Sequence, residues 1–310
     1  MLSSFACAIP GIMATRTIPS AKDRIATMLS APLATCSARL PVYVLLVGIL
    51  VPAGSSLGPV SVRGLVLFGM YLLGALSAML AARVVKKITD RSGTLLPFYM
   101  EMPPYRIPTP RSVGMAMWEP TKAFLRKAGT IIMGATIVIW ALTTFPLRSD
   151  AEMTAAGVDP SDEVAATAYN MEHSAAAKVG KAIEPVFAPQ GFDWRVNISL
   201  IGSMAAREVA VSTLGQVASA SDPEDDVSVS ESVQKWTYTD GPHQGEKVFT
   251  PDTTIAMLIF FAFALQCVAT IGILKRESGG WKWPAIAFGY MFVLAWVGSS
   301  LAAIITRAVM

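Results

Sequence analysis

Four stretches of the chain are long and apolar enough to cross a lipid bilayer, and this constrains the fold more than any other feature of the sequence. They contain no Asp, Glu, Lys or Arg over 19 to 24 residues and occupy residues 64–82, 128–147, 253–274 and 283–306. The hydrocarbon core of a bilayer requires about 20 such residues in a helix. Charged side chains make up only 15% of the chain, against about 25% in soluble domains. We therefore predict an all-α integral membrane protein in which these stretches are ordinary, continuous spanning helices.

Three further apolar regions contain residues that interrupt a membrane helix. The interruptions are Pro10 and Gly11 in residues 1–15, Pro32, Arg39 and Pro41 in residues 25–51, and Arg207 with Glu208 in residues 196–221. Non-helical backbone at membrane depth is tolerated only where protein or a water-filled cavity surrounds it. These regions are therefore predicted to be broken helices or hairpins inside the protein.

The loop charges predict the topology. Residues 83–127 carry nine basic and three acidic side chains, which predicts a cytoplasmic loop. Its second part, residues 113–127, mixes aromatic and basic side chains and suits an interfacial segment that leads into a span. Residues 148–195 carry eight acids against four bases, and residues 222–252 carry eight against two, so both are predicted to be exterior loops.

The region between the two exterior loops must cross the membrane an even number of times. Residues 196–221 are too few for two spans, so we predict a re-entrant hairpin with its tip near Arg207 and Glu208. The alternative is a single span with one acidic loop on the other side. A hairpin followed by a cysteine-bearing helix then occurs twice, with Cys36 and with Cys267, in opposite orientations. Inverted repeats with broken helices are typical of secondary transporters.

All three cysteines, Cys7, Cys36 and Cys267, fall in or beside broken or apolar segments, and together they could offer three sulfur ligands to one ion. Thiolates suit borderline or soft cations such as iron(II), copper(I) or zinc. The alternative is that each cysteine is a small buried hydrophobe. Glu208 is a candidate hard ligand, proton acceptor or partner of Arg39.

Other side chains are predicted to have supporting roles. Ser212 and Thr213 are expected to satisfy the broken backbone of the second hairpin. The net charge of +3 gives no reason to expect nucleic acid. The chain also lacks a Walker-type phosphate loop, so we predict no nucleotide-binding site.

Several longer motifs resemble the ferrous iron transport protein B (FeoB) family, and the resemblance covers essentially the whole chain. The matching stretches are CAIPGIMATRT at 7–17, CSARLPVY at 36–43, MEMPPYR at 100–106, KAGTII at 127–132, GFDW at 191–194, AREV at 206–209, STLG at 212–215, CVAT at 267–270 and KRE at 275–277. Two positions depart from the family pattern, because Ala8 replaces an Asn and Gln266 replaces a Pro.

The resemblance implies a multi-pass iron(II) transporter of the bacterial inner membrane, built from transporter-type gate domains. Residues 1–82 would form the remainder of the first gate domain and residues 128–310 the second. The ion path carried over from the family falls on Cys7, Cys36, Cys267 and Glu208. Supporting positions are Pro10, Ser37, Arg39, Arg207, Ser212 and Thr213.

The same resemblance bears on partners. Family members carry an amino-terminal GTP-binding domain and further helices before the first signature, whereas Met1 lies just upstream of it here. We therefore expect a GTP-binding domain or an upstream membrane half on another chain, alongside membrane lipid and homo-oligomeric contacts. We predict a transporter and not an enzyme, with iron(II) as cargo and no permanently bound cofactor. The alternatives are a carrier of a nucleoside or another divalent metal on the same fold, and a non-transporting membrane fragment or scaffold.

Overall fold

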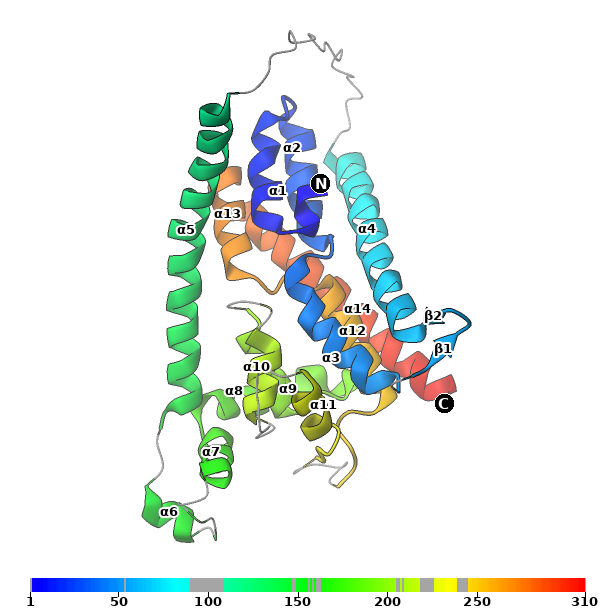
Figure 1. Ribbon diagram of the computed structural model, residues 1–310, viewed down its shortest axis with the longest axis vertical. Coiled ribbons are helices and arrows are strands. Elements are labelled where there is room, and N and C mark those ends of the chain that lie inside the picture. The colour runs from blue at the N-terminus through cyan, green and yellow to red at the C-terminus, as the bar shows by residue number, and fades with distance from the viewer. Residues whose placement is uncertain are drawn as a thin grey trace.

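The computed structural model describes residues 2–52, 54–89, 109–146, 149–155, 157, 159, 163–204, 207, 209–217, 226–238 and 245–309, and these are predominantly helical (Figure 1). With η for 3-10 helices, the elements in chain order are η1 (Leu2–Phe5), α1 (Ala8–Ala14), η2 (Thr15–Thr17), α2 (Ala21–Ser30), η3 (Ala31–Leu33), η4 (Ser37–Arg39), α3 (Leu40–Leu50), β1 (Ser56–Leu57), β2 (Val60–Ser61), α4 (Val62–Thr89), α5 (Pro110–Thr144), α6 (Asp150–Ala155), α7 (Glu163–Glu172), α8 (Ala175–Phe187), η5 (Ala188–Gln190), α9 (Trp194–Gly202), α10 (Val209–Val217), α11 (Asp226–Val233), α12 (Pro251–Phe263), α13 (Val268–Ser278) and α14 (Lys282–Val309).

Four helical segments in the described part of the chain are long and apolar enough to cross a membrane. They are Ala21–Leu50, Val62–Thr89, Pro251–Ser278 and Lys282–Val309. The predicted helices at 64–82 and 283–306 are confirmed, because each lies within one continuous helix, α4 or α14. Residues 128–144 of the remaining predicted span form the second half of α5, and the interfacial segment at 113–127 precedes them in the same helix.

The prediction of a continuous helix over residues 253–274 is wrong. The chain leaves the helical conformation after Phe263 and resumes it at Val268, so α12 and α13 are separated by residues 264–267. Neither Pro nor Gly occurs in this interruption. Its cause is tertiary, because groups outside the helix bind the backbone that the break exposes, as described below.

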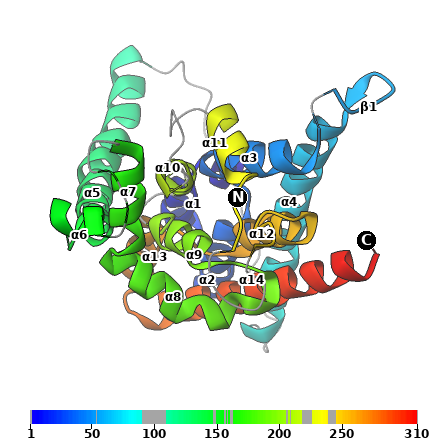
Figure 2. The same ribbon diagram turned by 90° about the horizontal axis from the view of Figure 1, so that it is seen from below.

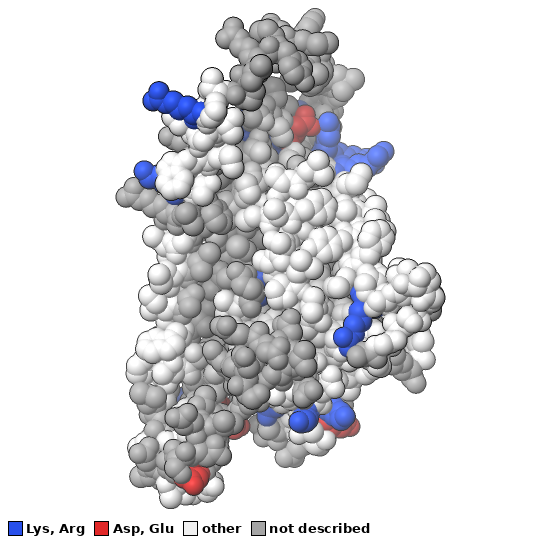
Figure 3. All heavy atoms as spheres, in the orientation of Figure 1, with Lys and Arg blue, Asp and Glu red and all other residues white. Residues whose placement is uncertain are grey.

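The ends of the molecule agree with the predicted topology. The C-terminal end of α4 and the N-terminal end of α5 lie at one end of the long axis, beside α1 and α2, while α6, α7 and α11 lie toward the other (Figure 1). On the face drawn in Figure 3, most charged side chains gather near these two ends and a broad uncharged band lies between them. The described ends of α4 and α5 that belong to the predicted cytoplasmic loop thus lie at the opposite end of the molecule from α6, α7 and α11, which belong to the predicted exterior loops. The domain boundaries and the side that faces the cytoplasm stay predictions.

The predicted hairpin over residues 196–221 is confirmed as a pair of short helices. α9 and α10 pack against each other and are joined by residues 203–208. A Cβ atom at Gly202 would lie 2.9 Å from the Thr213 hydroxyl, so the small residue permits the close approach. Seen from below, the hairpin lies near the middle of the molecule, with α5 and α4 on opposite sides (Figure 2). Its depth in a bilayer stays a prediction.

Candidate functional site

Two broken helices cross the middle of the molecule in opposite directions. The first runs from α2 through residues 31–39 into α3, and the second runs from α12 through residues 264–267 into α13. In Figure 1 the first passes from the α1 end toward the α11 end, and the second passes the opposite way. This antiparallel pair has the arrangement of an inverted repeat. The first break contains Pro32 and is followed by Pro41, in line with the sequence prediction.

Each cysteine occupies the N-cap position of a helical segment. Cys7 precedes α1, Cys36 precedes η4 and Cys267 precedes α13. All three have extended backbone conformations, with ψ angles of 137°, 160° and 103°. All three are partly exposed and none forms a disulfide. The thiols therefore stand at the points where the chain enters a helix, and they are not sealed inside the packed core.

Matching hydrogen bonds tie each hairpin to its neighbouring break. The Ser37 hydroxyl donates to the carbonyl oxygen of Ala6 at 2.9 Å, which joins the residue after Cys36 to the residue before Cys7. The backbone N–H of Val268, the residue after Cys267, donates to the carbonyl oxygen of Met204 at 3.0 Å. In both halves of the molecule, the hairpin is fixed at the residue that follows the cysteine of the break.

The two hairpin–break assemblies meet between α1 and α13. Cys7 and Cys267 both pack against the small cluster formed by Ile9 and Ala269. Within the described residues, however, no three side chains of the types His, Cys, Asp and Glu are close enough to hold a metal ion together. The described cysteines therefore do not form the single three-sulfur site that the sequence allowed.

Two buried arginines donate hydrogen bonds to backbone carbonyl groups that the breaks leave without a partner inside the helix. The Arg39 side chain is fully buried and donates to the carbonyl oxygens of Leu33, Ala34 and Pro32 at 3.2, 3.5 and 3.3 Å. Arg207 is 5% exposed and donates to the carbonyl oxygen of Ala264 at 2.9 Å. The last carbonyls of a helix have no partner within the helix. The arginines therefore replace the intrahelical hydrogen bonds that each break removes.

The remaining predicted residues have smaller roles. Pro10 lies in the first turn of α1, where its missing N–H removes no helical hydrogen bond. Ser212 donates to the backbone carbonyl oxygen of Val209 at the start of α10, and Thr213 packs on Gly202. Glu208 lies outside the described residues.

An ionic cluster that the sequence analysis did not identify joins the two halves at the α1 end of the molecule. Glu277, whose side chain is 3% exposed, accepts from Arg16 Nε at 2.8 Å and Nη2 at 2.5 Å, and Arg24 donates to its backbone carbonyl at 2.9 Å. The hydrogen bond that Arg16 donates to the Glu277 carboxylate raises the pKa of Arg16 above its usual range. The cluster connects η2 and α2 to the end of α13. The only sequence signal was that Arg16 and Glu277 both fall in motifs that match the FeoB family.

Comparison with known proteins identifies two matching family models. The model described as "Ferrous iron transport protein B C terminus" matches residues 67–119, and the model described as "Nucleoside recognition" matches residues 1–50 and 125–281. No solved structure gives a significant match.

Curated relatives match almost the whole chain. An Fe(2+) transport protein A/Fe(2+) transporter FeoB fusion protein from Porphyromonas gingivalis is 40% identical over 97% of this chain and 36% of its own length. The Fe(2+) transporter FeoB of Leptospira interrogans is 39% identical over 96% of this chain and 41% of its own length. The Fe(2+) transporter FeoB of Methanocaldococcus jannaschii is 34% identical over 96% of this chain and 39% of its own length. The chain thus spans about two fifths of the length of these relatives.

Proposed function

Because the chain belongs to the ferrous iron transport protein B family, we propose that it forms the membrane part of a path that carries iron(II) across the bacterial inner membrane. The path follows Cys7, Cys36 and Cys267. The observation that carries the proposal is that each of these partly exposed cysteines occupies the N-cap position of a helical segment at or beside a break, and that hydrogen bonds tie the hairpins to both breaks. Relatives over the whole chain are named Fe(2+) transporters.

Thiolates at these positions suit the proposed cargo. Iron(II) accepts sulfur ligands, whereas calcium and magnesium prefer oxygen. The N-terminus of a helix carries a partial positive charge, which favours a negative group at its cap. Cys267 occupies this position at the start of the 11-residue α13. Because the described cysteines do not form one three-ligand site, we propose that the ion passes from thiol to thiol.

The buried arginines favour release of the ion. The guanidinium of Arg39 interacts electrostatically with Cys36 and with the guanidinium of Arg207. A divalent cation bound at Cys36 is therefore attracted by the thiolate and repelled by Arg39. Conduction requires binding that is favourable enough for entry and weak enough for exit. Glu208, the remaining predicted polar group, would add negative charge at the tip of the second hairpin.

Several parts of the proposal concern the whole transporter. The chain acts as a multi-pass transporter and not as an enzyme, in contact with membrane lipid and as a homo-oligomer. Iron(II) is its cargo, and no cofactor is bound permanently. GTP hydrolysis is supplied by a GTP-binding domain outside the 310 residues, which fits a chain that spans about two fifths of its relatives.

The test is anaerobic iron(II) uptake by cells that lack their own transporter and express this chain together with the upstream region of the transporter. Uptake is compared between the wild type and Cys7→Ser, Cys36→Ser and Cys267→Ser at equal membrane abundance. Serine is close to cysteine in size and is favourable at an N-cap, but its hydroxyl is a poor ligand for a borderline metal. We expect about a tenfold or greater loss of uptake for at least two of the variants.

Ser174→Ala provides the matched control. It removes an N-cap hydroxyl at the start of α8, away from both breaks. Uptake close to the wild-type rate in this variant would show that a substitution at an N-cap position does not by itself abolish transport. Unchanged uptake in all three cysteine variants would refute the thiol path. Cysteine-independent uptake of a labelled nucleoside would favour the alternative suggested by the name of the second family model.

A further inference from the structure

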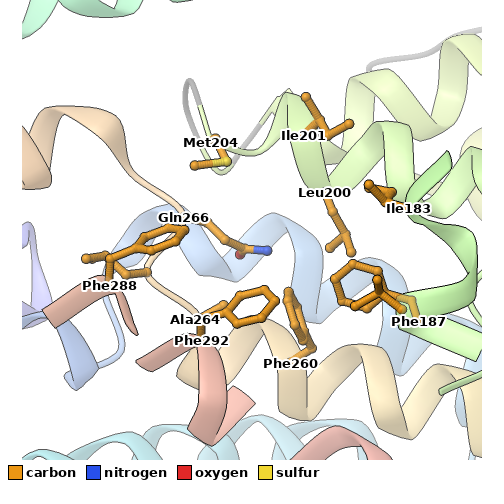
Figure 4. Close-up of a pocket in the computed structure, with 12 residues that line it drawn as sticks. Ile183, Phe187, Leu200, Ile201, Met204, Phe260, Ala264, Gln266, Phe288 and Phe292 are labelled. Atoms are coloured by element: carbon orange, nitrogen blue, oxygen red, sulfur yellow. The ribbon is translucent and has the colours of Figure 1, made fainter. Parts of the chain in front are cut away.

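A cavity of about 280 Å³ lies beside the second break, and no transport residue proposed above lines it. It lies between α8, α9, α12 and α14 and extends to the tip of the second hairpin. Its walls include the aromatic rings of Phe187, Phe260, Phe288 and Phe292 (Figure 4). This volume approaches the lower end of the range for small-molecule sites, which are concave and mostly apolar with a few polar groups.

The polar group of the cavity is the side-chain amide of Gln266. This residue is 4% exposed, and both its Nε2 and its Oε1 atoms lack a hydrogen-bond partner among the described residues. In Figure 4 its amide extends toward the space between Leu200 and Phe260. A buried amide without a partner is unfavourable. The other described residues that line the cavity have hydrocarbon or thioether side chains, so none of these side chains offers the amide a partner.

The aromatic wall determines the shape of that ligand. Phe187 and Phe260 lie edge to face at 5.6 Å, and Phe260 and Phe292 do so at 6.4 Å. Each ring thus holds its neighbour in place, and the wall accepts a flat aromatic body by stacking or edge contacts. None of the described residues that line the cavity carries a charge, and burial of an unpaired charge is unfavourable. A sugar would likewise lack partners for most of its hydroxyl groups.

We propose that this cavity binds an uncharged, flat aromatic molecule that presents an adjoining hydrogen-bond donor and acceptor, such as a ring lactam, to the amide of Gln266. The planar amide offers one donor and one acceptor side by side, which a lactam edge complements with two hydrogen bonds. Such a ligand would contact Met204 at the hairpin tip and also the residue before Cys267. Because Met204 accepts from Val268, we expect the bound ligand to stabilise the contact between hairpin and break.

The experiment measures binding of quinolin-2(1H)-one to the purified full chain in lipid nanodiscs, by ligand-observed NMR and by the shift in thermal midpoint. Protein-free nanodiscs correct for partitioning into lipid. The comparison ligand is 1-methylquinolin-2-one, which keeps the rings and the carbonyl but lacks the donor. We expect saturable binding of the first compound and at least about tenfold weaker binding of the second.

Three variants test the site. Gln266→Met keeps a long side chain but removes the amide, so we expect it to weaken quinolinone binding at least about tenfold and to abolish the difference between the two compounds. Leu200→Phe narrows the cavity and should weaken both compounds. Gln234→Met, at an exposed position in the turn after α11, is the matched control and should bind like the wild type.

Three outcomes of the binding measurements would overturn the proposal. They are equal binding of both compounds to the wild type, unchanged binding to Gln266→Met, and the absence of saturable binding to the wild type. A co-purified acyl lipid that quinolinone does not displace would also overturn it, because the cavity would then be a lipid site. The binding readout does not depend on iron, so failure of the thiol path would leave this result intact.

Discussion

Gly74→Ala should displace the first helix break through a steric conflict between α4 and the chain at the break. Gly74 lies on α4 where this helix approaches Thr35, the residue before Cys36. A Cβ atom at Gly74 would lie 2.1 Å from the Thr35 hydroxyl oxygen, 3.1 Å from its backbone nitrogen and 3.2 Å from its Cβ. Rotation of the hydroxyl would relieve only the first contact, so α4 or the break must move.

Gly69→Ala, five residues earlier on the same helix, is the matched control. A Cβ atom there would meet no atom within 4 Å. Replacement of a helical glycine by alanine stabilises the folded state by about 0.5–1 kcal/mol, because alanine loses less backbone entropy on folding, and both variants share this gain. Overpacking of a tight contact costs about 1–3 kcal/mol. The difference in unfolding free energy between the two variants therefore isolates the close contact, and we expect Gly74→Ala to be less stable by about 1–3 kcal/mol.

The assay is equilibrium unfolding of the two variants in mixed micelles, followed by iron(II) uptake in cells. Because Thr35 adjoins Cys36, we expect Gly74→Ala to transport more slowly than Gly69→Ala at equal abundance. Adding Thr35→Ala removes the hydroxyl and should recover part of the lost stability, a coupling that a double-mutant cycle measures. Equal stability of Gly74→Ala and Gly69→Ala would refute the reasoning.

Three further predictions concern buried polar groups. Arg39→Met should lower the unfolding free energy by about 3 kcal/mol, because three carbonyls lose a charged donor; a thermal midpoint equal to that of the wild type would contradict this. Glu277→Gln should destabilise by only about 1 kcal/mol in micelles, because Arg16 is half exposed and solvent screens the pair, and the loss should shrink when Arg16→Met is already present. Asp193 accepts hydrogen bonds from the backbone N–H groups of Arg195 and Val196 through Oδ1. Burial raises the pKa of its carboxyl group. The ionised form therefore lowers the stability of the folded state at neutral pH, and the folded state gains stability as the pH falls through the raised pKa. Asp193→Asn should therefore keep the cap, exceed Asp193→Ala in stability by about 1 kcal/mol and flatten the pH dependence of unfolding, whereas equal stability of the two variants would argue against a capping role.

Much of the architecture could be predicted because hydrophobic length and loop charge are properties of the sequence itself. The helices at 64–82 and 283–306 follow from charge-free stretches of membrane length, and α4 and α14 contain them. The hairpin at 196–221 follows from a count of crossings between two acidic loops. The break near Pro32 follows from the missing N–H of proline and its steric conflict with a helix.

The break at residues 264–267 depended on groups distant in the sequence. Residues 253–274 have the composition of a continuous membrane helix, and nothing local ends α12 at Phe263. The break is stable because Arg207 binds the Ala264 carbonyl and Met204 accepts from the N–H of Val268. A membrane helix can open only where other groups take over its backbone hydrogen bonds. Those groups lie more than fifty residues away in the chain, so no local pattern reveals them.

The same division applies to the candidate site. The sequence by itself predicted that Cys7 and Cys36 lie in or beside apolar segments interrupted by proline, and that Cys267 lies in a charge-free stretch of membrane length. Only the tertiary structure decided that each cysteine stands at the N-cap position of a helical segment, that Arg39 and Arg207 bind the breaks, and that Arg16 meets Glu277 across 261 positions. It also left Gln266 facing an apolar cavity with its amide unpaired. The physical reason is that apolar length can be read along the chain, whereas the partner of a polar group at membrane depth depends on which distant segments fold against it.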